Sequence, residues 1–556
     1  MRGLFILVLT TIFVGLAAPF IAATKPQTII INAHIYQHAD ADMIVIKNGK
    51  INAIDNQTNI DNYDPDNAQI IDAEGGYILP GFIDNHNHVF EAMSEVGGTC
   101  SLPAEVGLNR IIAALKLCKA NAPPNSWVMG YGFALEDIIE LPGLQAAQII
   151  NQIFPNQPVV IVEQTSHSVW ANDVALKRAN IAMQFYDDQA ISFMLLDWET
   201  LKPTGILFDQ AADALMDYAW NAAENTQQLS YVGLLDGLAE VAANGITTIG
   251  DGRLYWQRGW WDVWQKVAAE GALTARVSVR PWVYPDVDMA TQLDFFKQIY
   301  NADTSKLLIV DQAKFYADGI VINGTAKTKA AYFDTYIPDY PYGLDFFSPA
   351  ALRNWLSELS KIGYGAHIHA IGDAGVANAL DAISQQTPKT GINYTISHVE
   401  LVDKADIARF EQLNITADFQ IGHDDIANND HAWAVPFLGE TRAQNFLDIG
   451  AIYNTGANIS LSSDWDVYPL NPLVGIKNSL KMGAKGLPNI DAAIAAYTIN
   501  AAKSLGLDDI TGSITIGKSA DFVLLDADIT QLKIADIDKA QILMSILQGN
   551  VVFVAE

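Results

Sequence analysis

Hydrophobic and polar residues alternate with different periods in different parts of the chain. Near the N-terminus, short β-rich runs are separated by turn residues, and two of them flank Asn48-Gly49, a dipeptide typical of a hairpin turn. The C-terminal part has the same character, with strands predicted over Phe522 to Leu525 and Val551 to Val554. We therefore predict one small β domain formed from both ends of the chain, residues 28–80 with 508–556.

Between these flanks, short apolar runs alternate with helical stretches, which is typical of βα units around a parallel sheet. The stretch 135–225 is less regular, and we predict that it is an insertion over the active face. The rest predicts an α/β barrel over 81–507, and its candidate strands outnumber the eight positions of a closed barrel by one. They are Gly81–Asp84, Trp127–Gly130, Thr247–Gly250, Arg276–Val279, Leu307–Val310, Ala366–Ala370, Tyr394–His398, Ala417–Ile421 and Ile459–Ser462.

The first residues form a separate segment. Arg2 is the only charged residue before Lys25, a nearly continuous apolar run extends from Leu4 to Ala18, and small residues follow it. This order of regions is that of a secretory signal peptide. We expect residues 1–23 to be cleaved and the mature chain to be exported, to the periplasm or outside the cell. An uncleaved membrane anchor is the alternative, because the apolar segment is about long enough to span a bilayer.

Composition narrows the range of functions. Half of the 556 residues are hydrophobic, which is enough for a large buried core, and 33 Lys and Arg stand against 63 Asp and Glu, for a formal net charge of −30. Such a charge repels phosphate backbones and argues against nucleic-acid binding. Only Cys100 and Cys118 could form a disulfide, and in an oxidising compartment we expect them to pair. Two unpaired thiols are the alternative.

Histidines at the ends of predicted strands are the candidate chemistry. His86 and His88 stand two apart, so both imidazoles can point to one side of a strand and reach one metal ion. An HxH pair alone is a weak signal, since His367 and His369 form a second one. Further candidates at or past strand ends, in chain order, are Lys314, His369, His398 and Asp464. In a barrel these strand ends converge on one face, where residues are typically catalytic.

The chain resembles the amidohydrolase superfamily, in particular its branch related to N-substituted formamide deformylase. The resemblance extends from about Ile29 to the C-terminus. The segments that carry it are Ile78-Leu79-Pro80-Gly81-Phe82-Ile83-Asp84-Asn85-His86-Asn87-His88, Lys314-Phe315-Tyr316-Ala317-Asp318-Gly319, His369-Ala370-Ile371-Gly372-Asp373, Ile396-Ser397-His398, Ser462-Ser463-Asp464-Trp465 and Gly512 to Asp521.

This resemblance implies a (β/α)8 TIM barrel with a β-sandwich domain made from both termini, and a centre of one or two divalent metal ions, usually zinc. It implies that His86 and His88 hold the more buried ion, and that His369 and His398 hold the second. Lys314 would bridge them as a carbamate, and Asp464 would bind metal and shuttle protons. His167 and Tyr316 are weaker candidates for contact with the substrate. His367 is interpreted as a strand neighbour of His369 that points elsewhere or into the pocket wall.

The chemistry of this ligand set is hydrolysis. A divalent metal lowers the pKa of bound water from about 15.7 to about 7 and so yields hydroxide, which can attack a weakly electrophilic amide carbonyl. Asp464 would take the proton and deliver it to the leaving nitrogen. We predict hydrolysis of non-peptide carbon–nitrogen bonds in a small amide-type substrate. The alternatives are lactone, ester or carbamate substrates on the same site, and a catalytically inert relative that binds metal or ligand.

Overall fold

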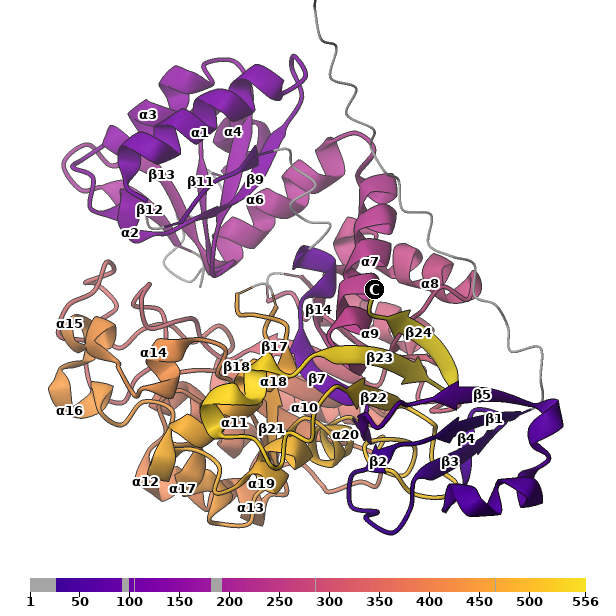
Figure 1. Ribbon diagram of the computed structural model, residues 1–556. Coiled ribbons are helices and arrows are strands. Elements are labelled where there is room, and N and C mark those ends of the chain that lie inside the picture. Colours follow the sequence, from indigo (N-terminus) through magenta and orange to yellow (C-terminus); the bar gives the residue numbers. More distant parts are fainter. Residues whose placement is uncertain (1–26, 93–99, 105, 182–192, 286, 466) are drawn as a thin grey trace, which may run out of the picture.

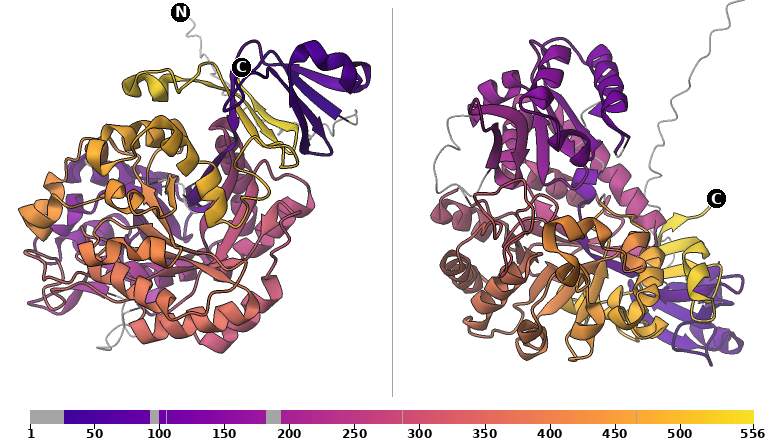
Figure 2. Two further views of the ribbon diagram at one scale, coloured as in Figure 1. Left: turned by 90° about the horizontal axis from the view of Figure 1, so that it is seen from below. Right: turned by 90° about the vertical axis from the view of Figure 1, so that its left-hand side faces the viewer.

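The computed structural model describes residues 27–92, 100–104, 106–181, 193–285, 287–465 and 467–556. The predicted signal peptide lies outside these residues. Figure 1 shows a central barrel, an inserted α/β unit and a small β domain, and the views of Figure 2 place the latter two on different sides of the barrel. Within the described part of the chain, every helix is too short or too polar to cross a membrane.

Eight parallel strands form the barrel. They pair in chain order, except that β15 and β17 are joined by one parallel bridge, between Trp282 and Lys314. The amide of Asp464 donates to the carbonyl of His86 (2.8 Å), so the last strand returns to the first and closes the ring. The strands are β7 (Phe82–Asn87), β14 (Ile246–Leu254), β15 (Arg276–Pro281), β17 (Gln312–Tyr316), β18 (Gly365–Ala370), β19 (Tyr394–His398), β20 (Thr416–Gln420) and β21 (Ile459–Ser462).

The strand sequences suit this geometry. In β18, which reads Gly-Ala-His-Ile-His-Ala, alternate residues face the barrel interior and the surrounding helices. His367 and His369 therefore lie on the interior side, and Ile368 on the helix side. Ser348 caps α10 by accepting from the amide of Ala351, which satisfies one of the free N–H groups at the helix start.

Helices connect the strands and cover the barrel. The longer ones are α7 (Thr226–Ala243), α8 (Trp260–Ala269), α9 (Met289–Ile299), α10 (Pro349–Ile362), α11 (Asp373–Ser384) and α18 (Pro472–Lys481). Shorter ones are α12 (Lys404–Ile407), α13 (Arg409–Gln412), α14 (Asp424–Ala427), α15 (Val435–Leu438), α16 (Glu440–Ala443), α17 (Ile449–Tyr453), α19 (Ile490–Ala496) and α20 (Ile499–Ser504).

The inserted unit is a six-stranded sheet with its own helices. Its strand order is β12-β13-β11-β10-β9-β8, with bounds Phe193–Asp197, Lys202–Phe208, Ser168–Ala171, Val159–Glu163, Val128–Phe133 and Cys100–Ser101. Its helices are α1 (Leu108–Asn121), α2 (Glu136–Ile139), α3 (Gln145–Ile153), α4 (Asp173–Ala179) and α6 (Asp209–Ala222). Cys100 and Cys118 form a disulfide between β8 and α1.

Two of the predicted barrel strands are not part of the barrel. The insertion begins near Cys100 rather than at 135, and Trp127–Gly130 belongs to its sheet, where β9 pairs with β10 in parallel. Parallel βα units inside the insertion have the same sequence pattern as barrel units, so periodicity does not separate them. Leu307–Val310 is also not the barrel strand at its position. Its short β16 (Leu308–Ile309) lies beside β15, and the barrel position belongs to β17.

Both ends of the chain form the small domain as two sheets, as the sequence predicts. One sheet has the order β4-β3-β1-β5 and the other β2-β6-β22-β23-β24. The second sheet joins the termini, because β6 pairs with β22 along Tyr77 to Pro80. The bounds are β1 (Gln27–Ile31), β2 (His34–Ile35), β3 (Met43–Lys47), β4 (Lys50–Asp55), β5 (Ala68–Asp72), β6 (Tyr77–Pro80), β22 (Phe522–Leu525), β23 (Ile542–Leu547) and β24 (Asn550–Val554).

Candidate metal centre

The two histidines of β7 meet Asp464 at the barrel mouth. His86 Nε2 lies 3.2 Å from His88 Nε2, and Asp464 Oδ1 lies 3.0 Å from His88 Nε2 and 3.4 Å from His86 Nε2. All three side chains are buried. Gly252 of β14 makes room for them, since a Cβ there would come within 2.8 Å of His88 Nε2. Three potential ligand atoms therefore face one point.

Lys314 reaches the same point from β17. Its Nζ lies 3.1 Å from His86 Nε2, and the side chain is fully buried. Burial lowers the pKa of this amine well below its ordinary value, and the nearby arginines act in the same direction. Burial also lowers the pKa of His86, and the charge of Lys314 lowers it further. Both shifts favour the neutral forms of these groups, which have a lone pair to donate.

His369 and His398 complete the cluster from β18 and β19. Their ring centroids lie 4.3 Å apart, and the ring of His398 lies 5.0 Å from that of His86. Burial lowers the pKa of His398 to about 3 and that of His369 well below its ordinary value. His398 has φ +73° and Asp464 has φ +54°. Positive φ is uncommon for residues other than glycine, although less so for His and Asp than for most, and such conformations cluster at functional sites.

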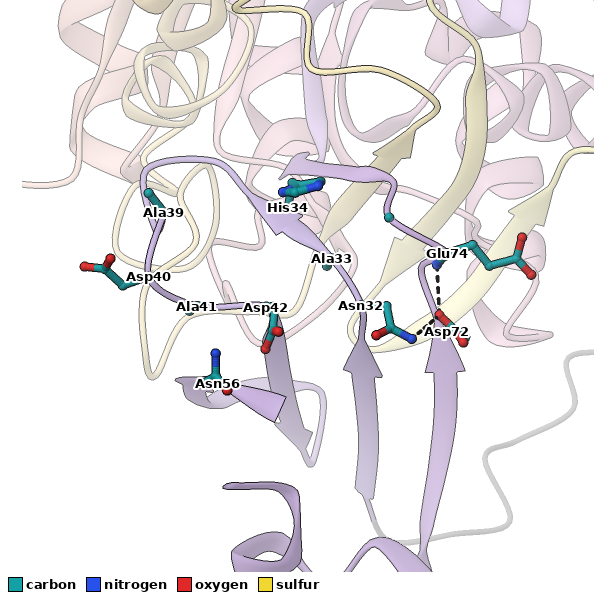
Figure 3. Close-up of a pocket in the computed structure, with 11 residues that line it drawn as sticks. Asn32, Ala33, His34, Ala39, Asp40, Ala41, Asp42, Asn56, Asp72 and Glu74 are labelled. Atoms are coloured by element: carbon teal, nitrogen blue, oxygen red, sulfur yellow. Dashed lines mark hydrogen bonds between the residues drawn. The ribbon is translucent and has the colours of Figure 1, made fainter. Parts of the chain in front are cut away.

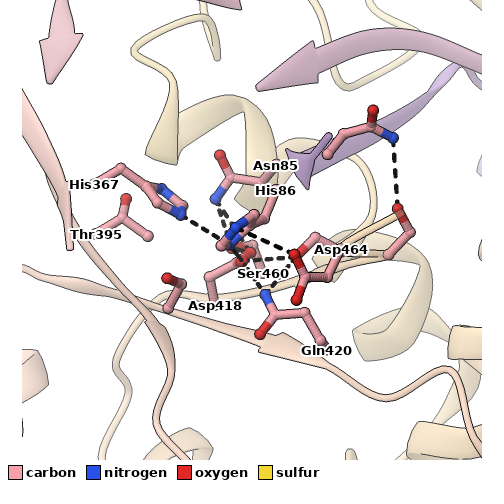
Figure 4. A network of polar contacts seen from close by, with 12 residues as sticks. Asn85, His86, His367, Thr395, Asp418, Gln420, Ser460 and Asp464 are labelled. Atoms are coloured by element: carbon pink, nitrogen blue, oxygen red, sulfur yellow. Dashed lines mark hydrogen bonds and ion pairs between the residues drawn. The ribbon is translucent and has the colours of Figure 1, made fainter. Parts of the chain in front are cut away.

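A second set of polar side chains surrounds the Nδ1 side of His86 (Figure 4). His367 Nε2 is 3.2 Å from His86 Nδ1, and Asp418 Oδ2 is 4.0 Å from it. Asp418 accepts hydrogen bonds from Ser460, Ser462 and Gln420 at 2.5 to 2.7 Å. A fixed partner at Nδ1 orients the ring and leaves Nε2 directed at the other ligand atoms. His367 thus contacts a candidate ligand. The prediction that it points elsewhere or into the pocket wall does not include this contact with His86.

The other side of His88 is fixed by a buried ion pair. Glu91 contacts His88 Nδ1 through one oxygen, and its other oxygen accepts from Nε and Nη2 of Arg253 at 2.9 and 2.7 Å. Arg253 Nη1 also donates to the hydroxyl of Tyr316 (2.5 Å). Burial alone would lower the pKa of His88, but Glu91 and Asp464 raise it to about 9. A positive charge at His88 is therefore favoured between the carboxylates of Glu91 and Asp464.

These features fit a divalent metal ion. Neutral imidazole nitrogens and an ionised carboxylate are metal ligands. Burial raises the pKa of Asp464, but the hydrogen bond and the charge of His88 outweigh burial and lower this pKa to about 2. Among the described residues, Nδ1 of buried His369 has no hydrogen-bond partner. A buried nitrogen without a hydrogen-bond partner calls for an explanation, and a bound metal ion would provide its partner.

The two candidate substrate contacts lie beside the cluster. The Tyr316 ring stacks on His369 at 4.2 Å and on His167 at 5.3 Å. His167 is held by Asp209 at 2.8 Å from its Nδ1. Both residues line a small cavity at the cluster with Arg253, and His167 also lines a larger one of about 680 Å³ that reaches His369, His398 and Asp464.

The structure brings together all six sequence-predicted ligand side chains. Sequence reasoning missed the supporting residues His367, Asp418, Glu91 and Arg253. The two-residue period of β18 was a usable signal for His367, because it places His367 on the same side as His369. Glu91 stands three residues after His88, one turn in a helical segment. Nothing in the chain order indicates that Arg253 lies beside Glu91.

A different hollow lies on the small β domain (Figure 3). Its volume is about 560 Å³, and it shares no residue with the cluster. Asp72, one of its acidic residues, already accepts from Asn32 Nδ2 (2.8 Å) and from the amide of Glu74 (2.9 Å). The barrel mouth is therefore the candidate site.

Comparison with known proteins agrees with this geometry. The profile of the amidohydrolase family matches residues 69–553. The chain is 27% identical over 516 residues to Protein LONG AFTER FAR-RED 3 of Arabidopsis thaliana, covering 88% of this chain and 84% of that protein. It is 23% identical over 543 residues to N-substituted formamide deformylase of Arthrobacter pascens, covering 94% and 97% of the two chains.

Solved structures share the fold. An uncharacterized metal-dependent hydrolase from Pyrococcus horikoshii superposes with a TM-score of 0.70 at 19% identity, covering 92% of this chain and 99% of that one. A second such hydrolase, from Pyrococcus furiosus, gives 0.68 at 18% identity, with 90% and 99% covered.

Proposed function

The chain belongs to the amidohydrolase family, and on this premise we propose that it hydrolyses carbon–nitrogen bonds of non-peptide amides with a metal centre at the barrel mouth. The observation that carries the proposal is the convergence of donor side chains from the ends of five barrel strands on one cluster. His88, Lys314 and Asp464 lie within 3.4 Å of His86 Nε2, and the rings of His398 and His369 pack beside them. Residues that meet in this way at the carboxyl ends of barrel strands are typically catalytic.

His86, His88, His369, His398 and Asp464 would hold the metal, with Lys314 between the two histidine pairs. A donor set rich in imidazole suits zinc. A bound divalent metal would supply Lewis acidity and lower the pKa of a coordinated water to about 7. His367 and Asp418 orient His86, while Glu91 orients His88, so the chain fixes each ring before the metal arrives.

We propose that Lys314 is carbamylated. Its neutral Nζ can attack the carbon of carbon dioxide, which forms an N–C bond and releases one proton. The product is an anion with two oxygen donors. A cationic lysine beside two dications would be repelled, and the carbamate removes this conflict.

Asp464 is the proposed proton carrier. It lines the cavity that a substrate would enter, and its low pKa makes it ionised at neutral pH. It would accept a proton from the attacking water as the new C–O bond forms. It would then deliver that proton to the leaving nitrogen as the C–N bond breaks. Tyr316, held by Arg253, and His167 are placed to contact the substrate.

We also propose that the protein acts outside the cytoplasm. The disulfide between Cys100 and Cys118 supports this, since disulfides persist in oxidising compartments. N-terminal sequencing of protein from cell fractions tests the proposal. A mature chain that begins near residue 24 outside the cytoplasm is expected, and an intact N-terminus in the cytoplasm would contradict it.

The function is tested by metal analysis together with a panel of amides, esters and lactones. We expect bound zinc, amide hydrolysis by the loaded protein and loss of activity after chelation. Crystals with anomalous data would count the ions and show any added density on Lys314 Nζ. Hydrolysis of esters or lactones without amides would replace the proposed substrate class, and no turnover on any carbonyl would indicate an inert relative.

A further inference from the structure

We infer that the substrate of this site is an amide with a bulky apolar group and no carboxylate. N-acyl amines would then be hydrolysed, while N-acyl amino acids and peptides with free C-termini would be excluded. The inference rests on the proposed function and adds to it the chemical class of the substrate. It follows from the walls and the charges of the larger cavity at the barrel mouth.

Apolar side chains form much of the wall of this cavity, and they come from separate parts of the chain. Leu102 comes from the inserted unit, Ile322 from the turn after β17, and Phe446 and Leu447 from the segment before α17. The volume of about 680 Å³ lies within the range of pockets that enclose small organic ligands. An apolar group in contact with these walls is removed from water, which favours binding.

Away from the metal centre, the same walls offer no permanent positive charge. Among the described residues that line the cavity there is no Lys and no Arg. Its acidic side chains away from the metal centre are Glu136 and Glu400, which are neutral or negative in every protonation state. The remaining groups that can become cationic there are imidazoles, including His423 and His431 in the outer wall.

The arginine nearest to the centre is already engaged. Arg253 donates three hydrogen bonds, two to Glu91 and one to Tyr316, and it lines only the small inner cavity. Lys314, proposed above as a carbamate, is fully buried against His86 and offers no positive charge. With the amide at the metal centre, a carboxylate on the apolar part of the substrate would lose its hydration without gaining a cationic partner in the wall, which disfavours binding. The formal net charge of −30 repels anions at longer range as well.

A matched pair of substrates tests the inference. N-acetyl-2-phenylethylamine and N-acetylphenylalanine differ only in the carboxylate. The assay uses metal-loaded protein at pH 8, above the ordinary imidazole pKa of about 6.5, so that an imidazole of ordinary pKa is uncharged. We expect kcat/KM to be at least about a hundredfold higher for the amine derivative, because the other would bury an unpaired charge. An equal or higher value for N-acetylphenylalanine would overturn the inference and leave the proposed function standing.

A charge placed in the wall should shift this preference. Ile322 is half-buried and lines the cavity, so Ile322→Arg would bring a guanidinium to the substrate. We expect the ratio of the two kcat/KM values to move toward the carboxylate by roughly tenfold or more, as a charge-assisted hydrogen bond would produce. Ile322→Gln is the uncharged control and should leave the ratio near the wild-type value. Equal shifts in both variants would contradict the charge argument.

Binding measurements distinguish a failure of this inference from a failure of the proposed function. Titration calorimetry of zinc-loaded protein with each amide needs no turnover. If neither compound is hydrolysed, the proposed function fails for these amides, while tighter binding of the uncharged amide still supports the inference. Tighter binding of N-acetylphenylalanine would overturn it.

Discussion

The inner and outer ends of the larger cavity at the barrel mouth differ in chemical character. At the inner end, His86, His88 and Asp464 are buried polar groups held by hydrogen bonds to further buried polar groups. At the outer end, residues such as Leu102 and Phe446 are apolar, and they come from the insertion and from long connections. The inner end has one arrangement that works, since each ligand atom must meet the same point. On the proposed function, the outer end needs only shape and the absence of charge, so chemistry and selectivity would reside in different residues.

The largest expected effect comes from the inner end, in Asp464→Asn. The amide cannot carry the proton, so we expect kcat to fall by about 10²–10⁴-fold. Most of the metal should remain, because the histidine ligands are unchanged. Stopped assays with metal analysis on the same sample measure both. A variant that keeps its kcat would show that another group moves the proton.

The substitution Glu91→Gln tests whether Glu91 holds the candidate ligand His88 in place at the inner end. The neutral amide holds His88 less firmly and leaves Arg253 without its ionic partner, so metal affinity should fall by roughly 10–100-fold. Competition with a chelator measures the affinity directly. Glu163→Gln is the matched control, since burial raises the pKa of that carboxyl to about 8 in the inserted sheet. Equal losses in both variants would indicate a general effect of removing a buried carboxyl.

Phe446→Leu tests the outer end. Phe446 packs at 5.2 Å from the His431 ring and 5.5 Å from the Trp433 ring and lines the cavity. We expect KM for an aromatic amide to rise by up to about tenfold with kcat nearly unchanged, since a few methylene-sized contacts are lost. Phe410→Leu removes a buried ring from α13 and should leave KM unchanged. A fall in kcat for Phe446→Leu would contradict the separation of the two ends.

The smallest effect on turnover is expected from Cys118→Ser. The bond to Cys100 closes a loop of 18 residues within the insertion, and its loss removes about 3 kcal/mol on the chain-entropy model. Urea unfolding should show an earlier transition of the inserted unit, with metal content and kcat retained. Loss of metal in this variant would mean that the insertion supports the inner end as well.

The same contrast explains what the sequence predicts. His86, His398 and Asp464 lie at or just past the ends of strands whose periodicity is clear, and barrel topology brings strand ends together regardless of what connects them. The clustering of the candidate ligands is therefore predictable from chain order. For Lys314 the resemblance gives further support, because the strand predicted before it, Leu307–Val310, lies several residues earlier than β17.

The remaining features depend on tertiary contacts. Arg253 and Glu91 are distant in sequence and meet only because β14 lies beside β7. The wall of the cavity combines the inserted unit with two barrel connections, and no local pattern states which side chains face one another. The boundary of the insertion was misplaced for the same reason, since β9 has the pattern of a barrel strand.

The pairing of β6 with β22 has a consequence for how the protein is made. This sheet combines β6 with β22, β23 and β24, so it cannot form until residues 522–554 have been synthesised. Until then, the apolar run of β6 has an open edge, a surface that favours aggregation and makes a chain dependent on chaperones. A chain that ends before Phe522 is therefore expected to be degraded rather than to accumulate as a partly active barrel.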